Sequence, residues 1–153
     1  MKKINPEFLI KKLIPVFYQA GAKSIKCSKK LKIHIKEDGT PVSNGDLEVD
    51  AIIQSFLKKI TPNIEIVSEE TIQETKNKTR DTFWLIDPID GTSSYIKGGS
   101  EYTINVGLII KKRLLLVLFM PQKKRGYFIA MEKTNLMKFI IKRKKLNLIV
   151  QKN

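Results

Sequence analysis

Apolar residues recur at helical spacing in two stretches near the start of the chain. The first stretch opens with Asn5-Pro6-Glu7, a sequence typical of a helix start, and we expect this helix to weaken or stop at Gly21. Its apolar positions are Phe8, Leu9, Leu13, Phe17 and Ala20. The second helix is predicted to run from an N-cap at Ser43 to Thr61-Pro62. Its apolar stripe is predicted to consist of Leu47, Ala51, Ile52, Phe56 and Leu57.

Shorter apolar runs, some of them alternating with polar residues, predict the strands. They cover residues 31–36, 65–67, 83–86, 102–110, 114–120 and 126–130. Lys111-Lys112-Arg113 is typical of the turn of a hairpin between two of them. Because helices come before most strands and a β-meander closes the pattern, we predict an α+β fold. In this layered α/β sandwich, helices pack on a mainly antiparallel sheet.

The composition favours one compact domain. The 153 residues are 42% apolar, which is enough for one core and marginal for two. The net charge of +14 is concentrated near the end of the chain, since residues 111–153 hold 13 Lys or Arg against a single acid. Residues 1–110 hold 16 Lys or Arg against 14 acids. We therefore predict a domain over residues 1–130 and a divergent basic tail over residues 131–153.

Several other features bear on the compartment and on alternative chemistry. Pro6 and charged residues interrupt any secretory signal at the start, and the longest strongly apolar run, residues 114–120, is too short to span a bilayer. The one cysteine, Cys27, cannot form an internal disulfide and fits a reducing cytoplasm. The one histidine, His34, lies among lysines on a predicted solvent-facing side. A packed cysteine and a surface histidine are therefore favoured over a catalytic Cys–His pair.

The candidate chemistry is centred on the run Asp87-Pro88-Ile89-Asp90-Gly91-Thr92, which follows a buried-looking strand. Pro88 fixes one backbone dihedral, so the chain can leave the sheet with two carboxylates and the Ile89 carbonyl presented together. Hard cations such as Mg²⁺ prefer oxygen ligands of this kind. If Thr92 opens a helix, the free amides of Gly91, Thr92 and Ser93 would point at a phosphate. The alternative for this run alone is a plain Asp-Gly turn with an N-cap.

Two distant segments favour the metal site over the plain turn. Val67-Ser68-Glu69-Glu70 ends a predicted strand in adjacent carboxylates, for which a solvated loop pair is the alternative. Asp46 stands in the first turn of the second helix, where the alternative is a capping acid that gains roughly 0.5 kcal/mol from the helix dipole. Each segment has a common structural explanation by itself, so the hypothesis depends on the combination.

Together and in this order, these segments resemble the inositol monophosphatase superfamily, and within it the bacterial 3'(2'),5'-bisphosphate nucleotidases of the CysQ type. The resemblance covers about residues 5–130. Its matching stretches are Lys36–Asp46, Val67–Glu70, Trp84–Thr92 and Tyr95–Ile109. The last stretch points to the nucleotidase branch, because it is similar to that branch's pattern Phe-Ile-Lys followed by Gly-Glu-Phe-Thr-Val-Asn.

The resemblance implies Mg²⁺ as the cofactor and a set of site residues. The metal ligands would be the carboxylates of Glu69, Asp87 and Asp90 and the carbonyl of Ile89. Asp46 and Thr92 would form the catalytic pair that orients and deprotonates the attacking water, and the backbone of Gly91, Thr92 and Ser93 would hold the phosphate. The implied reaction is hydrolysis of a small phosphorylated nucleotide, 3'-phosphoadenosine 5'-phosphate, to AMP and phosphate in the cytoplasm. Glu70 receives no role, since adjacent residues at a strand end face opposite ways.

The chain departs from the family pattern in its second half. The family fold is a considerably longer α/β/α/β/α sandwich, and its second half supplies a further aspartate from a Trp-Asp-x-Ala-Ala-Gly motif. The last aspartate here is Asp90 and the one tryptophan is Trp84. We therefore expect a missing second domain, a frameshifted or prematurely terminated gene, and little phosphatase activity in the isolated chain. An exposed sheet would then favour self-association.

Two alternatives to the nucleotidase remain open from the sequence. One is a truncated, catalytically inactive fragment that binds metal or a full-length relative. The other uses the basic tail, residues 133–153, as a contact for nucleic acid or for an anionic membrane, such as the cytoplasmic face of the inner membrane. No groove-reading motif accompanies the tail, so no specific nucleic acid is expected.

Overall fold

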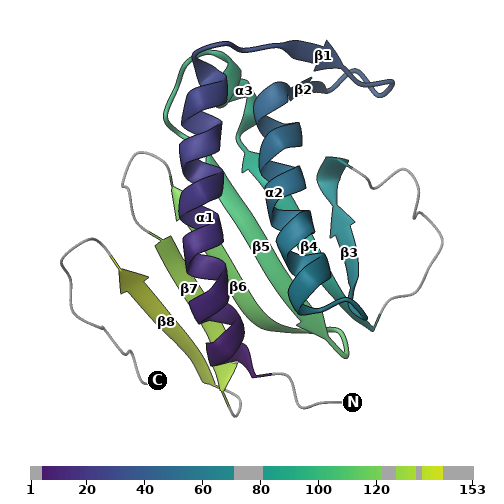
Figure 1. The fold of residues 1–153 in the computed structure, drawn as a ribbon, viewed down its shortest axis with the longest axis vertical. Helices are drawn as coiled ribbons and strands as arrows, with labels where there is room; N and C mark the ends of the chain where they lie inside the picture. Colours follow the sequence, from purple (N-terminus) through teal and green to yellow (C-terminus); the bar gives the residue numbers. More distant parts are fainter. Residues whose placement is uncertain (1–4, 71–80, 122–126, 134–135, 143–153) are drawn as a thin grey trace.

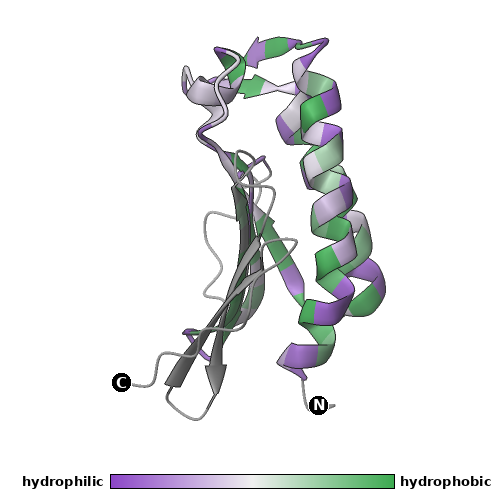
Figure 2. Ribbon diagram, turned by 90° about the vertical axis from the view of Figure 1, so that its left-hand side faces the viewer, coloured by the Kyte–Doolittle hydropathy of each residue, from purple (hydrophilic) through white to green (hydrophobic). Residues whose placement is uncertain are grey.

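Two long helices cover one face of a sheet (Figures 1 and 2). The computed structural model describes residues 5–70, 81–121, 127–133 and 136–142. The two helices are α1 (Pro6–Ser28) and α2 (Asn44–Ile60), and they lie side by side in Figure 1. Between them in the chain stands a hairpin of β1 (Ile33–Ile35) and β2 (Pro41–Ser43), and the short α3 (Thr92–Ile96) contacts β2.

Six strands form the main sheet within the described ranges, and their spatial order follows the sequence. They are β3 (Glu65–Ser68), β4 (Thr82–Asp90), β5 (Thr103–Ile110), β6 (Arg113–Pro121), β7 (Tyr127–Lys133) and β8 (Leu136–Lys142). The β3–β4 pair is parallel and the remaining neighbouring pairs are antiparallel. The predicted α+β fold with a mainly antiparallel sheet is thus confirmed. Lys111 and Lys112 both have positive φ, as a tight hairpin turn between β5 and β6 requires.

The core lies between the helix pair and the sheet. Its fully buried side chains come from both helices and from the three central strands, and they include Leu13, Phe17, Val49, Ile53, Leu57, Trp84, Val106, Leu108, Leu116 and Leu118. Burial of each such side chain contributes about 1.5–3 kcal/mol. Trp84 also donates from its indole nitrogen to the Thr61 hydroxyl at 2.9 Å, which ties β4 to the end of α2. This packing fixes the relative position of α2 and β4, the two elements that carry most of the predicted site.

The inward face of α2 differs from the predicted one. Of the predicted stripe only Leu57 is fully buried, while Leu47 is 48% exposed. The residues that the helix buries are Gly45, Asp46, Val49, Asp50, Ile53 and Leu57. The prediction chose a neighbouring face because two carboxylates on the buried side break its apolar pattern.

The first helix is longer than predicted and continues through Gly21 to Ser28. A glycine inside a helix costs about 1 kcal/mol relative to alanine, and tertiary packing commonly outweighs such a cost. Gly21 is itself buried, whereas Phe8, which the prediction placed on the apolar stripe, is 53% exposed. Cys27 is buried and His34 is exposed, as predicted.

Strand boundaries near the predicted site and near the end of the chain also differ. β4 does not stop at Ile86 but continues to Asp90, with a register shift between Asp87 and Asp90. β7 extends beyond the predicted residues 126–130, and β8, which pairs with it, falls in the segment that we assigned to a basic tail. The boundary between a domain over residues 1–130 and a tail over residues 131–153 remains a prediction. Residues 143–153 lie outside the described residues, so the proposed contacts of the tail remain predictions as well.

None of the helices in the described part of the chain combines the length and the apolar character that crossing a bilayer requires.

Candidate active site

The start of α2 places Asp46 at the base of the site. Ser43 is the N-cap, as predicted, and its hydroxyl accepts hydrogen bonds from the amides of Gly45 and Asp46. One carboxylate oxygen of Asp46, Oδ2, accepts from the Ser43 amide at 2.8 Å and from the Ser43 hydroxyl at 2.5 Å. The pair forms a capping box, which satisfies backbone donors at the helix start. Asp46 is 1% exposed, so this carboxylate is held rigidly and out of water.

The second oxygen of Asp46 contacts the predicted catalytic threonine. The Thr92 hydroxyl lies 3.2 Å from Asp46 Oδ1 and 2.9 Å from the Ile89 carbonyl oxygen. A hydroxyl has one proton to donate, so these two acceptors share it. The structure therefore brings together Asp46, Ile89 and Thr92, which the sequence had placed on two distant segments.

The irregular end of β4 presents the other carboxylates. Asp87 is paired with Asn105 of β5, and after the register shift Asp90 is paired with Thr103. Such a bulge re-aims side chains at the end of a strand. Asp90 is exposed, and its Oδ2 accepts a hydrogen bond from the Asn105 side-chain amide at 3.1 Å. Asn105 thus orients Asp90 from the neighbouring strand.

Asp87 is the most perturbed carboxyl group of this site. Its pKa is raised from 3.8 to about 7, first by burial, then by the charge of the neighbouring Glu69 and a hydrogen bond with the Glu69 side chain, and then by the charges of Asp90 and Asp46. Its Oδ1 atom is buried and has no hydrogen-bond partner. Carboxylates brought this close disfavour one another's ionisation. The three segments singled out in the sequence therefore converge on one acidic cluster, which consists of Asp46, Glu69, Asp87 and Asp90.

The donor set of the acidic cluster fits a hard divalent cation. A buried carboxylate oxygen without a partner is costly, and a bound cation would remove both this cost and the repulsion between neighbouring carboxylates. Mg²⁺ prefers carboxylate and carbonyl oxygens together with water. Within the described ranges, no three or more His, Cys, Asp and Glu side chains already stand in the arrangement that holds a metal ion. The roles of Glu69, Asp87, Ile89 and Asp90 as ligands therefore remain predictions.

Glycine is required where β4 passes into α3. Gly91 is the N-cap of α3 and has a φ of 98°, a backbone conformation that residues other than glycine rarely adopt. A Cβ atom at this position would lie 2.8 Å from the Glu101 carbonyl oxygen. Thr92 and Ser93 form the first positions of α3, which meets the condition set for a phosphate-binding helix start. Their amides stand where a helix leaves backbone donors without helical acceptors.

We expect Gly91→Ala to lower the free energy of unfolding by about 2–3 kcal/mol. The positive φ alone costs on the order of 1 kcal/mol for alanine, and the approach to the Glu101 carbonyl adds a steric cost. Gly98→Ala is the matched control, because Gly98 also has positive φ, 74°, but an added Cβ would meet nothing within 4 Å. Urea unfolding of both variants measures the difference. Equal destabilisation by the two substitutions would contradict the steric part of this prediction.

Two sets of contacts around the site were not predicted. The Tyr95 ring lies against Gly45, so that an added Cβ on Gly45 would clash with the Tyr95 hydroxyl oxygen. The same hydroxyl donates to the carbonyl of Ser24 in α1 at 2.6 Å. Tyr95 therefore holds α3 against the start of α2 and keeps Thr92 within reach of Asp46. The one signal in the sequence for this contact is Gly45, a residue small enough for a ring to pack against it.

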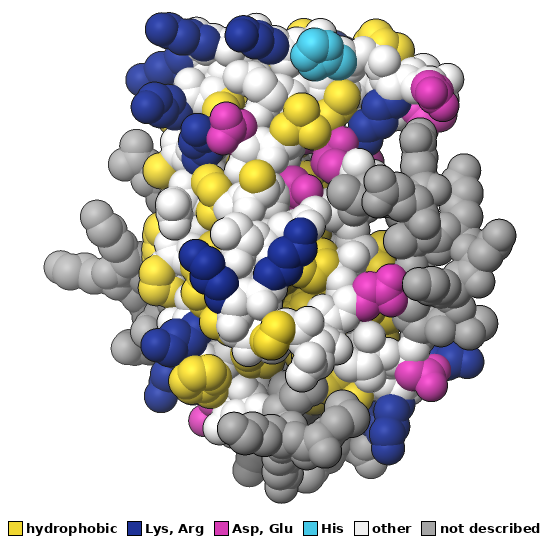
Figure 3. Space-filling model, turned by 45° about the vertical axis from the view of Figure 1, so that its right-hand side comes forward, with side chains coloured by type: hydrophobic (Ala, Val, Ile, Leu, Met, Phe, Trp, Pro, Cys, Tyr) yellow, Lys and Arg dark blue, Asp and Glu magenta, His cyan; other side chains and the backbone are white. Residues whose placement is uncertain are grey.

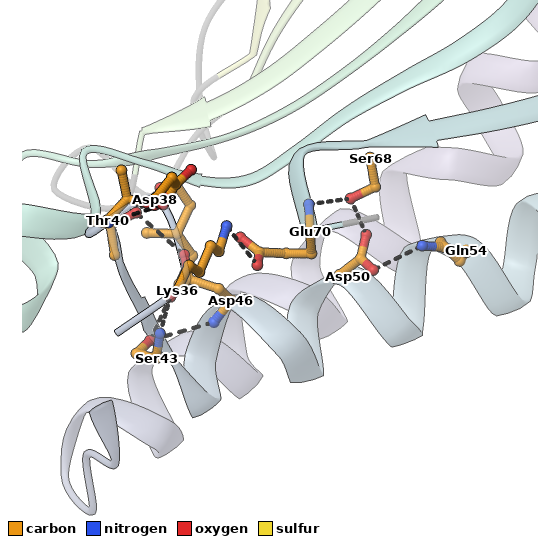
Figure 4. Close-up of polar contacts among 11 residues, drawn as sticks. Lys36, Asp38, Thr40, Ser43, Asp46, Asp50, Gln54, Ser68 and Glu70 are labelled. Atoms are coloured by element: carbon orange, nitrogen blue, oxygen red, sulfur yellow. Dashed lines mark hydrogen bonds and ion pairs between the residues drawn. The ribbon is translucent and has the colours of Figure 1, made fainter. Parts of the chain in front are cut away.

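The other unpredicted contact concerns Glu70. It forms an ion pair with Lys36 at 2.9 Å, and both side chains are largely buried (Figure 4). Burial lowers the pKa of Lys36, but the hydrogen bond and charge of Glu70 outweigh this effect and raise it. Glu70 thus points to the β1–β2 segment. On the face of the molecule drawn in Figure 3, Asp and Glu side chains lie among Lys and Arg side chains in the upper half.

The sequence of the chain is similar to those of one known protein family. The sequence profile of the inositol monophosphatase family matches residues 9–145. The 3'(2'),5'-bisphosphate nucleotidase CysQ of Aggregatibacter actinomycetemcomitans is 35% identical over 105 residues, which are 66% of this chain and 39% of that protein. The CysQ protein of Haemophilus influenzae is 31% identical over 126 residues, 80% of this chain and 47% of that protein. The chain thus spans less than half the length of these relatives.

Solved structures show the same fold at low sequence identity. Staphylococcal inositol monophosphatase-1 superposes with a TM-score of 0.79 at 17% identity, over 92% of this chain and 52% of that one. An IMPase/NADP phosphatase complexed with Mg²⁺ and phosphate superposes with a TM-score of 0.77 at 18% identity, over 88% of this chain and 51% of that one.

Proposed function

Because the chain belongs to the inositol monophosphatase family, we propose that its acidic cluster serves a Mg²⁺-dependent phosphomonoesterase reaction. The proposed substrate is a 3'(2'),5'-bisphosphate nucleotide such as 3'-phosphoadenosine 5'-phosphate, which would yield AMP and phosphate. The nucleotidase names of the relatives support this substrate class over an inositol phosphate.

The observation that carries the proposal is the buried, unpartnered Oδ1 of Asp87 within the acidic cluster. In the proposed site the carboxylates of Glu69, Asp87 and Asp90 and the carbonyl of Ile89 hold Mg²⁺. A bound Mg²⁺ would supply charge neutralisation at the phosphate and Lewis acidity toward the attacking water. Asn105 orients Asp90 through the 3.1 Å hydrogen bond.

The chain's own proton chemistry rests on Asp46 and Thr92. A threonine hydroxyl is too weak a base by itself, and a carboxylate that accepts its proton makes its oxygen a better acceptor. In the proposed reaction the Thr92 hydroxyl donates to Asp46, and its oxygen lone pairs accept the proton of the attacking water. The amides of Gly91, Thr92 and Ser93 are proposed to hold the phosphate that the water attacks.

A second candidate is binding of Mg²⁺ and phosphate without turnover by this chain alone. The specific observation in its favour is that the chain covers only 39–47% of the two CysQ relatives. A site completed by further residues would exclude water better and would raise the electrostatic effect of each charge. In this case the acidic cluster binds its ligands, but hydrolysis needs the rest of the fold.

Phosphate release from 3'-phosphoadenosine 5'-phosphate, measured with Mg²⁺ and with chelator, tests the proposal. Mg²⁺-dependent release that is abolished in Asp90→Asn and Glu69→Gln supports the nucleotidase. Release that is equal in the parent and in these variants shows that the site assignment is wrong. Calorimetry with Mg²⁺ and inorganic phosphate addresses the second candidate, which predicts binding without release.

A further inference from the structure

A second buried carboxylate lies one helical turn after Asp46, and the proposed reaction does not use it. Asp50 of α2 is 7% exposed. Its Oδ1 accepts a hydrogen bond from the Ser68 hydroxyl at 2.6 Å, and its Oδ2 accepts one from the Gln54 side-chain amide at 2.7 Å (Figure 4). The contact with Ser68 joins α2 to the end of β3.

Ser68 transmits this contact to the segment that carries Glu69. The Ser68 hydroxyl accepts a hydrogen bond from the Glu70 amide at 3.3 Å while it donates to Asp50. Ser68 is fully buried and immediately precedes Glu69. Glu69 is exposed, so its own side chain is not held by packing in the core. The residues before and after Glu69 are therefore both held by hydrogen bonds of the Ser68 hydroxyl, one to Asp50 and one from the Glu70 amide.

Burial of a carboxylate at position 50 is costly. Burial raises the pKa of Asp50, and the hydrogen bonds from Ser68 and Gln54 oppose this rise. Removal of a charge from water is unfavourable unless hydrogen bonds satisfy the charged group. A leucine or valine at this position would pack the same helix face without that cost. The geometry therefore indicates a role beyond attachment of α2 to the sheet.

We infer that Asp50 is a positioning residue, which acts through the Ser68 hydroxyl to fix the backbone of Glu69 and thereby the place of the Glu69 carboxylate in the acidic cluster. The inference rests on the proposed function, since it concerns a proposed Mg²⁺ ligand. Hydrogen bonds behind a metal ligand reduce the freedom that the ligand loses when the metal binds. Removal of such a partner typically costs 10- to 100-fold in metal affinity.

The test compares Mg²⁺ affinity among variants of the whole chain, by calorimetry with MgCl₂ well below the melting temperature. We expect Asp50→Ala and Ser68→Ala each to weaken Mg²⁺ binding about tenfold, with little further loss when the two are combined, because both break the same link. Asp50→Asn retains an oxygen acceptor for Ser68, and the Gln54 amide can rotate to match it. This variant should therefore bind Mg²⁺ within about twofold of the parent.

Two control variants test whether a loss of Mg²⁺ affinity comes from the Ser68 contact rather than from a less stable helix or from a lost negative charge. Gln54→Ala removes the other partner of Asp50 and leaves the Ser68 contact intact. Glu48→Gln removes a negative charge from the same helix, at the pair with Lys23. Neither should change Mg²⁺ affinity beyond about twofold. Hydrogen exchange without Mg²⁺ gives an independent readout, because the Glu70 amide should exchange faster in Asp50→Ala and at the parental rate in Asp50→Asn.

The outcomes distinguish the inference from the function on which it rests. Parental affinity in Asp50→Ala and Ser68→Ala, with Mg²⁺ binding intact in the parent, overturns the inference alone. Failure of the parent to bind Mg²⁺ overturns the proposed function, and the inference falls with it. If Asp50→Ala does not fold, the Mg²⁺ affinity of Ser68→Ala tests the inference, because this variant leaves the Asp50 carboxylate paired with Gln54.

Discussion

Asp87→Asn should abolish the response of the chain to Mg²⁺ and, at the same time, stabilise the metal-free protein above pH 7. Both effects have the same origin. The Asp87 carboxylate has a buried oxygen without a partner and stands beside Glu69, Asp90 and Asp46. Asparagine removes the charge that these neighbours oppose, but it also removes a ligand that Mg²⁺ needs.

The pH dependence follows from the direction of the pKa shift. The pKa of Asp87 is raised from 3.8 to about 7 in the folded protein, so the folded state holds this proton more tightly than the unfolded state does. Stability therefore falls as the pH rises from about 4 to about 7 and is constant above that range. Because Asp87 is half-buried and partly screened by water, we expect a loss on the order of 1–2 kcal/mol. Asp87→Asn should not show this loss.

Urea unfolding at pH 4, 5.5 and 7.5, with and without saturating MgCl₂, measures both effects. The parent should gain stability from Mg²⁺ at pH 7.5, and Asp87→Asn should gain none. Asp81→Asn is the matched control, since Asp81 is exposed and precedes the opposite end of β4. A parent whose stability is unaffected by Mg²⁺, or an Asn variant that responds like the parent, would contradict the prediction.

Thr92→Val should lower the rate of Mg²⁺-dependent phosphate release by about 10²- to 10⁴-fold, the range typical of a lost proton-transfer group. Valine has nearly the shape of threonine but cannot donate to Asp46 Oδ1 or accept a proton from water. Mg²⁺ affinity should change little, because the hydroxyl is not among the proposed ligands. The loss should therefore appear in the turnover number.

Thr92→Ser is the matched control for this substitution. Serine retains the hydroxyl and should keep most of the activity, while it loses only the methyl group of threonine. Assays of phosphate release at saturating Mg²⁺ and substrate separate the three proteins. A valine variant that releases phosphate within tenfold of the parent would exclude the proposed proton path through Thr92 and Asp46.

The fold class was largely predictable because its signals are local. Caps, hairpin turns and apolar periodicity located both long helices and most strands. The errors lie where tertiary context outweighs local preference. α1 continues through the buried Gly21, and β4 continues through Pro88 to Asp90 with a register shift. Local propensity cannot reveal such an extension, because partners from distant segments stabilise it.

The inward face of α2 shows a different kind of failure. Asp46 and Asp50 are buried on the same face as Val49, Ile53 and Leu57. Hydrophobic periodicity treats a carboxylate as a sign of solvent, so it assigned the apolar stripe to positions that include the exposed Leu47. Conflicts between local pattern and burial are expected at functional or strained sites. Here the conflict marks Asp46, which belongs to the acidic cluster, and Asp50, which pairs with Ser68 next to Glu69.

Local signals along the chain predicted two capped helices, a β-meander and three acidic segments that resemble one family. The packing of distant segments brings Asp46, Glu69, Asp87 and Asp90 into one acidic cluster, turns Glu70 toward Lys36, and pairs the Ser68 hydroxyl with Asp50. The reason is physical. Periodicity and capping depend on neighbours within a few residues, whereas the burial and mutual repulsion of carboxylates depend on segments that packing alone brings together.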